Sequence, residues 1–135
     1  MKTPKYMLAL VAASTMMTLP LQAAQARENL ACSLVDVVAC KTDGECLQGS
    51  SRDFDIPNLL IVDFKNKQVK AHSEYADDSV SIIKNMEETE EQLILQGVEN
   101  HKGWTLAIDR ETSSLALTSS GEDLSMMMFG SCTQK

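Results

Sequence analysis

Four cysteines are the residues of this chain with the most evident chemistry. Cys32, Cys40, Cys46 and Cys132 are separated by eight, six and 86 positions. A structural zinc site usually contains close Cys-x-x-Cys pairs, and these spacings contain none. Two disulfides, for which three pairings exist, are therefore the favoured interpretation.

The positions of the cysteines favour one of the three pairings. Cys40 and Cys46 flank Thr42-Asp43-Gly44, and Asp-Gly is a strong signal for a hairpin turn that would bring the two sulfurs together. Cys32 and Cys132 lie near the two ends of residues 27–135, so a bond between them would join the first strand to the last. We predict the pairs Cys40–Cys46 and Cys32–Cys132.

Methionine and histidine are the other candidate metal ligands. Met126 and Met128 of the Met126-Met127-Met128 run would share one face of a strand, and thioethers suit Cu(I). No histidine is near them in sequence, so we prefer adaptable packing in a core strand. His72 and His101 stand 29 positions apart and form no metal-binding motif. We predict no metal and no cofactor.

An acidic segment could gather calcium or face a basic partner. A calcium loop alternates oxygen ligands with a glycine at its sharp turn, and this segment has no such glycine. We interpret it as a solvated turn that keeps the basic-partner possibility open. Its residues are Glu87, Glu88, Glu90 and Glu91, with Asp77 and Asp78 nearby.

Catalytic motifs are absent from the sequence. There is no Gly-x-Ser-x-Gly, and disulfides account for the cysteines, so we predict no catalytic residue and no enzymatic activity. The aromatic residues outside the first 26 positions barely suffice for a core, which argues against an aromatic sugar-binding platform. They are Phe54, Phe64, Tyr75, Trp104 and Phe129.

The first 26 residues resemble a cleaved export signal. A basic start with Lys2 and Lys5 precedes an apolar run over 7–19, and Ala24-Gln25-Ala26 fits the small-x-small cleavage rule. The apolar run is too short for a stable membrane span, and Cys32 lies too far from it for lipidation. We predict residues 1–26 as a signal peptide and 27–135 as one disulfide-linked β domain, periplasmic or secreted, without a membrane anchor.

The charge of the chain limits its partners. Loss of Lys2 and Lys5 with the signal lowers the formal net charge from −7 to −9. Such acidity repels nucleic acids, so we expect no nucleic-acid partner.

Short apolar runs separated by turn residues predict strands throughout residues 27–135. The clearest pattern is Trp104, Leu106 and Ile108 alternating with polar or small residues, which places Trp104 in the core. Residues 79–95 could form a helix starting at Ser79, but we prefer two strands joined by an acidic turn. The predicted strands cover 31–40, 46–49, 59–64, 68–72, 80–84, 93–98, 104–109, 115–117 and 124–129.

These strands leave no room for crossover helices, so the predicted fold class is all-β. We expect a small antiparallel up-and-down β-barrel, or meander, of about eight strands, because closing the sheet removes its exposed edges. A two-sheet β-sandwich is the alternative.

Several segments together resemble a group of small exported bacterial proteins that have no assigned activity. These segments are 93–100, Gly103-Trp104, Ile108-Asp109, residues 129–132 and the Cys32…Cys40…Cys46 spacing. The resemblance implies a bacterial periplasmic setting and brings no site residues with it. The expected barrel also resembles lipocalin-type and lysozyme-inhibitor folds, at the level of fold alone.

The function that these observations predict is a non-enzymatic binding module, with an unknown small ligand inside the barrel or a protein on its rim. The alternative is an acidic inhibitor of a basic secreted hydrolase, which the net charge, the disulfides and the acidic turn favour.

Overall fold

A computed structural model describes residues 27–74 and 77–135, which form nine strands and one short 3-10 helix. The predicted signal peptide, its cleavage site after Ala26, and Tyr75 lie outside the described residues. The elements are β1 (Leu30–Lys41), β2 (Cys46–Ser50), η1 (Arg52–Phe54), β3 (Leu59–Asp63), β4 (Gln68–His72), β5 (Ser79–Glu88), β6 (Gln92–Glu99), β7 (Lys102–Asp109), β8 (Ser114–Ser120) and β9 (Leu124–Gln134).

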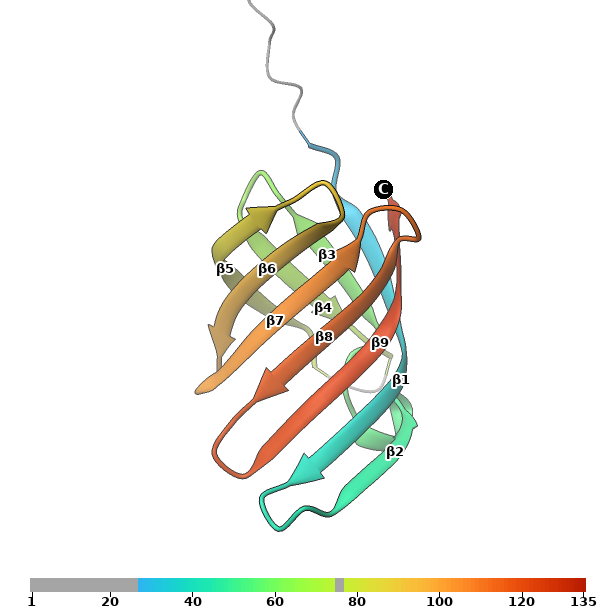
Figure 1. Ribbon diagram of the computed structural model, residues 1–135, viewed down its shortest axis with the longest axis vertical. Coiled ribbons are helices and arrows are strands. Elements are labelled where there is room, and N and C mark those ends of the chain that lie inside the picture. The colour runs from blue at the N-terminus through green and yellow to red at the C-terminus, as the bar shows by residue number, and fades with distance from the viewer. Residues whose placement is uncertain (1–26, 75–76) are drawn as a thin grey trace, which may run out of the picture.

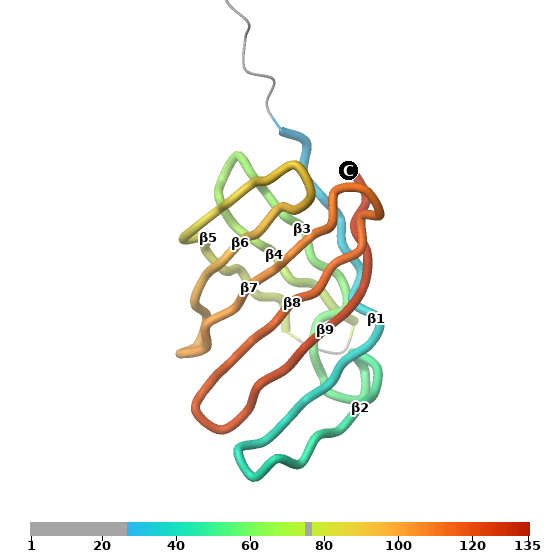
Figure 2. Tube along the Cα trace, in the orientation of Figure 1, coloured from blue at the N-terminus to red at the C-terminus, as the bar shows by residue number. Residues whose placement is uncertain are grey.

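Eight of the strands form a closed antiparallel barrel (Figure 1). Strand β1 pairs with β3 along one edge and with β9 along the other, and the trace shows β1 and β9 side by side (Figure 2). Closure pairs both of the edges that an open sheet would expose. The predicted all-β barrel is thereby confirmed, and the sandwich alternative was wrong.

Strand β2 departs from the simple meander. Sequential pairing holds from β3 to β9, but β2 does not pair with β3. Both strands use the same edge of β1, which is long enough to hold them one after the other. Strand β2 is therefore an added ninth strand, and it extends past the barrel at the end opposite the described termini (Figure 1).

The last strand is longer than the sequence predicted. We expected it to end at Phe129, but β9 continues to Gln134. Phe129 points outward and is 42% exposed, so its expected place in the core was wrong. Gly130 lies opposite Leu34, where β1 bulges at Val35. A Cβ atom at Gly130 would lie 1.7 Å from the carbonyl oxygen of Ser33, so the two backbones approach this closely only because residue 130 is glycine.

Gly130→Ala is expected to lower the free energy of unfolding by about 3 kcal/mol or more, because backbone atoms of the closing strand pair must move apart. Gly103→Ala is the matched control, since a Cβ atom there meets nothing within 4 Å. Urea denaturation monitored by circular dichroism measures both variants. Equal stability of the two would contradict the close β1–β9 contact.

The core follows the predicted alternation. Trp104, Leu106 and Ile108 point inward and are 9%, 0% and 5% exposed, so the predicted burial of Trp104 is confirmed. Residues 79–95 form strands rather than the alternative helix, with the turn at Thr89–Glu91. The largest fully buried side chains are Cys32, Val37, Val62, Leu95 and Leu106.

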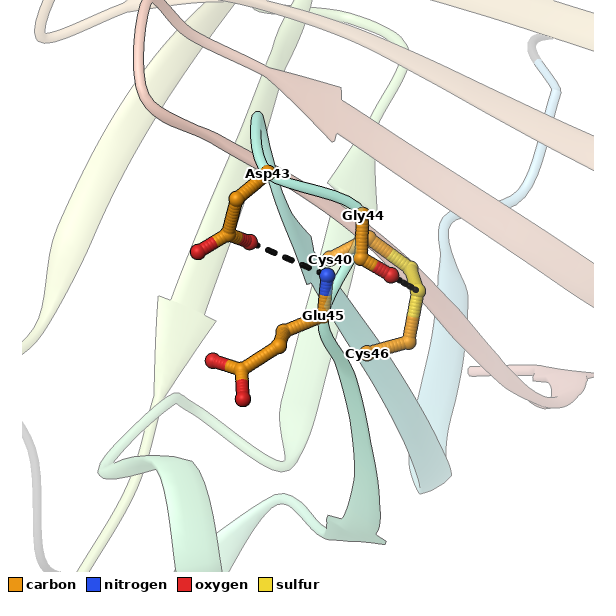
Figure 3. The surroundings of a disulfide bond; sticks show 5 residues. All are labelled: Cys40, Asp43, Gly44, Glu45 and Cys46. Carbon is orange, nitrogen blue, oxygen red and sulfur yellow. Dashed lines mark hydrogen bonds between the residues drawn. A yellow bond between two sulfur atoms is a disulfide. The ribbon is translucent and has the colours of Figure 1, made fainter.

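Both predicted disulfides are present. Cys32–Cys132 is buried between the first and last strands of the barrel. Cys40–Cys46 crosslinks β1 to β2 beside a tight turn, where the Asp43 carboxylate accepts a hydrogen bond from the backbone N–H of Glu45 (Figure 3). Disulfides of this kind are typical of proteins in an oxidising compartment.

Asp63 stabilises the turn between β3 and β4. This buried carboxylate accepts hydrogen bonds from the backbone and side-chain nitrogens of Asn66, at 3.1 and 2.8 Å, and from Lys70 Nζ at 3.1 Å. The Asn66 side chain first, then its backbone N–H and Lys70, hold the pKa of Asp63 well below its usual range. The carboxylate form therefore favours the folded state.

Asp63→Asn is expected to lower the melting temperature at neutral pH. The difference in melting temperature between this variant and wild type is expected to become smaller in acid. Because the folded-state pKa is depressed, the stabilisation is complete above the unfolded pKa of about 3.9 and is lost as the pH falls through the lower folded-state value. Thermal melts at neutral pH and at about pH 3 test this. If the difference in melting temperature were the same at both pH values, the charge of Asp63 would not stabilise the fold.

Candidate ligand-binding cavity

The strongest candidate site is a cavity of about 270 Å³ at the barrel end opposite the described termini, which we call the Trp104 cavity. Side chains from β1, β3, β4, β7, β8 and β9 and from the loop before β3 form its apolar wall. The apolar lining residues are Leu34, Ile56, Pro57, Leu60, Ala71, Trp104, Leu117, Met126 and Met128.

Trp104 is held in place by the strands beside it. It is paired in register with Gly97 of β6, where a Cβ atom would lie 2.4 Å from the indole ring. Gly97 therefore makes the space that the ring occupies. The indole Nε1–H donates a hydrogen bond to Ser81 Oγ at 2.7 Å, and Ser81 is only 6% exposed. The ring has a fixed orientation at the cavity wall.

The hairpin between β6 and β7 forms part of the rim. Its two turn residues, Asn100 and His101, have φ values of 48° and 64°, as a two-residue turn compatible with strand twist requires. Glu99 and Lys102 are paired directly opposite each other across this turn, and both line the cavity. The charged groups of the cavity are therefore of opposite sign and adjacent.

A loop after β2 covers another side of the cavity. The buried Ser51 hydroxyl donates a hydrogen bond to the Leu34 carbonyl at 3.1 Å, and the Leu34 N–H donates to the Asn58 carbonyl at 2.9 Å. These bonds fix both ends of the loop to β1. Ile56 and Pro57 are thereby positioned as wall residues.

The other end of the barrel holds a larger and more polar cavity of about 840 Å³. Here Glu88 forms ion pairs with Arg27 and with Arg110, the second at 3.4 Å. The hydrogen bond from Arg27, and the positive charges of both arginines, hold the pKa of Glu88 below its usual range. Arg27 also lies 4.9 Å from the centre of the Phe64 ring, a cation–π contact.

The acidic segment is exposed, as the sequence predicted: Glu87, Glu88, Glu90 and Glu91 all lie at the surface. What the sequence did not predict is the pairing of one of them, because Glu88 forms ion pairs with two arginines. The arginines could not be matched to Glu88 by sequence, because they lie far from it along the chain.

The candidate metal ligands do not gather in one place. Met126 and Met128 line the Trp104 cavity, whereas Met127 points outward and is 44% exposed. His72 pairs with Asp78 at 2.9 Å, and His101 lies in the exposed β6–β7 turn. Within residues 27–74 and 77–135, no three His, Cys, Asp or Glu side chains are close enough to hold a metal ion.

The sequence did not single out Ser81. Its neighbours Val80 and Ile82 suggested a buried apolar strand, yet both point outward and are 57% and 47% exposed. The usable signal was the strict alternation: if Ile83 faces the core, then so does Ser81. Ser81, two residues before Ile83 on β5, faces the interior and accepts the hydrogen bond from the Trp104 indole.

No helix in the described part of the chain has the length and apolar character needed to cross a membrane. Comparison with protein-family models finds no match to this chain, and neither does comparison with curated proteins.

Proposed function

We propose that this chain is an exported, non-enzymatic binding protein that holds one small, largely apolar molecule in the Trp104 cavity. The single observation that carries the proposal is the cavity itself, an apolar space beside an ordered tryptophan at one end of a closed barrel. Apolar walls with a few fixed polar groups are the usual composition of small-ligand sites.

The barrel architecture supports this proposal. An eight-stranded barrel has room for its own side chains or for one small ligand. On β6 and β7, the fully buried pair Leu95 and Leu106 lies between the residues that line the two cavities. The two disulfides would maintain that frame after export into an oxidising compartment.

An inhibitor of a basic secreted hydrolase is the less favoured proposal. Its acidic docking turn would have to act through Glu87, Glu90 and Glu91, because Glu88 is already paired with two arginines. Binding of that kind would weaken as salt is added, since it depends on exposed charges. Binding in an apolar cavity would change little.

Titration with N-phenyl-1-naphthylamine, a neutral apolar fluorophore, tests the proposal. Trp104 is the only tryptophan, so energy transfer from tryptophan to the fluorophore reports on binding near this one side chain. We expect saturable binding of one molecule per chain, with little dependence on salt.

Ala71→Leu and Ala116→Leu form a matched pair for this titration. Ala71 lines the cavity, whereas Ala116 lies on the outer face, between inward-facing Leu115 and Leu117. The first variant is expected to weaken binding about tenfold or more by filling the site, and the second is expected to leave it unchanged. Equal affinity of both variants would place the fluorophore elsewhere and overturn the proposal.

A further inference from the structure

The most buried polar side chain that lines the Trp104 cavity is Ser81, which is 6% exposed; the hydroxyls of Ser79 and Ser119 also line it and are more exposed. The Ser81 hydroxyl oxygen accepts the hydrogen bond from the Trp104 indole. Among the hydrogen bonds of the described residues, none uses the hydroxyl hydrogen of Ser81 as donor. A buried hydroxyl thus lines an apolar cavity with its hydrogen available to an acceptor.

We propose that the molecule held in the Trp104 cavity is neutral and carries a carbonyl oxygen, as a ketone, aldehyde or ester, which accepts a hydrogen bond from Ser81. This inference rests on the proposed function and narrows it to a chemical class. The indole N–H, by donating to the same hydroxyl oxygen, polarises the hydroxyl and strengthens its donation to a ligand.

The surroundings of Ser81 favour a neutral acceptor over an anion. The walls contributed by Leu34, Leu60, Leu117 and Met128 offer no positive charge. A carboxylate beside buried Ser81 would lose hydration, and the hydroxyls of Ser81, Ser79 and Ser119 could return only uncharged hydrogen bonds, which is unfavourable. Lys102 and Glu99 are cross-strand neighbours at the rim, and together these two charged lining residues carry no net charge.

Three probes with equal numbers of non-hydrogen atoms separate these possibilities. Acetophenone has a carbonyl group, isopropylbenzene replaces its oxygen with a methyl group, and benzoate replaces its methyl group with a charged oxygen. The chain has one tryptophan, so a ¹⁵N-labelled sample gives one indole N–H resonance. This indole N–H donates the hydrogen bond to Ser81. Its shift during titration gives the affinity of each probe.

We expect acetophenone to bind, benzoate to bind at least tenfold more weakly, and Ser81→Ala to weaken acetophenone binding by about two- to tenfold. Isopropylbenzene should bind wild type and Ser81→Ala with the same affinity. Ser81→Thr keeps the hydroxyl and should still bind acetophenone more tightly than benzoate. It is the control for a loss of structure caused by any substitution at position 81. Ser33→Ala, on the outer face of β1, is the control serine.

Each contrary outcome has a distinct meaning. If Ser81→Ala weakens both neutral probes equally, or neither, the hydrogen bond to Ser81 is overturned while the apolar cavity stands. If benzoate binds most tightly, the ligand is an anion and the inference of a neutral ligand is wrong. If no probe moves the indole resonance, the inference and the proposed function both fail.

Discussion

Replacement of both Cys32 and Cys132 by alanine is expected to lower the free energy of unfolding by about 4–5 kcal/mol. The bond closes a loop with a sequence separation of 100, and in the chain-entropy model a loop of that length restricts the unfolded chain by this amount. It also crosslinks the two strands that close the barrel. Urea denaturation of the oxidised proteins measures the difference.

The second disulfide provides the matched control. Cys40 and Cys46 are separated by six positions, and their bond joins the added strand β2 rather than the barrel seam. Their replacement by alanine should cost about 2 kcal/mol in the same chain-entropy model. If the two double variants lost equal stability, the seam disulfide would not have the special role that its position assigns to it.

Trp104→Ala is expected to cost about 3–5 kcal/mol, because it empties a large buried volume beside the cavity. It also leaves Ser81 without its partner. Trp104→Phe keeps an apolar ring but loses the N–H donor, so a smaller loss of about 1–2 kcal/mol is expected. Circular dichroism melts of the two variants measure these costs.

The fluorescence of the native protein provides an independent check of the same residue. Emission from Trp104 should be blue-shifted and weakly quenched by acrylamide, because only 9% of the residue is exposed. Emission like that of free tryptophan, together with a wild-type melt for Trp104→Ala, would show that Trp104 is a surface residue.

Most of the barrel could be predicted from the sequence because its signals are local. Alternation at Trp104, Leu106 and Ile108 marks an inward face, and the Asp43-Gly44 turn marks the first hairpin. The Cys32–Cys132 pair then followed from barrel closure. Each of these inferences needed only neighbouring residues or the two ends of the chain.

The features that the sequence did not predict depend on contacts between distant segments. The bulge at Val35 adjoins the close backbone contact between Leu34 and Gly130, and the position of β2 depends on how long β1 is. On β5, two exposed β-branched residues concealed the inward-facing Ser81. Strand propensity favours such residues on either face of a sheet, so composition alone did not identify the buried one.

The most direct test of the central claim uses the methionine methyl groups as position markers. Met126 and Met128 line the Trp104 cavity, Met127 points outward, and Met86 lies near the end of β5 that carries Glu88. In a ¹³C-methyl-methionine sample of residues 27–135, saturating acetophenone is predicted to shift the Met126 and Met128 resonances and to leave Met86 and Met127 in place. Shifts confined to Met86 or Met127 would contradict ligand binding in the Trp104 cavity.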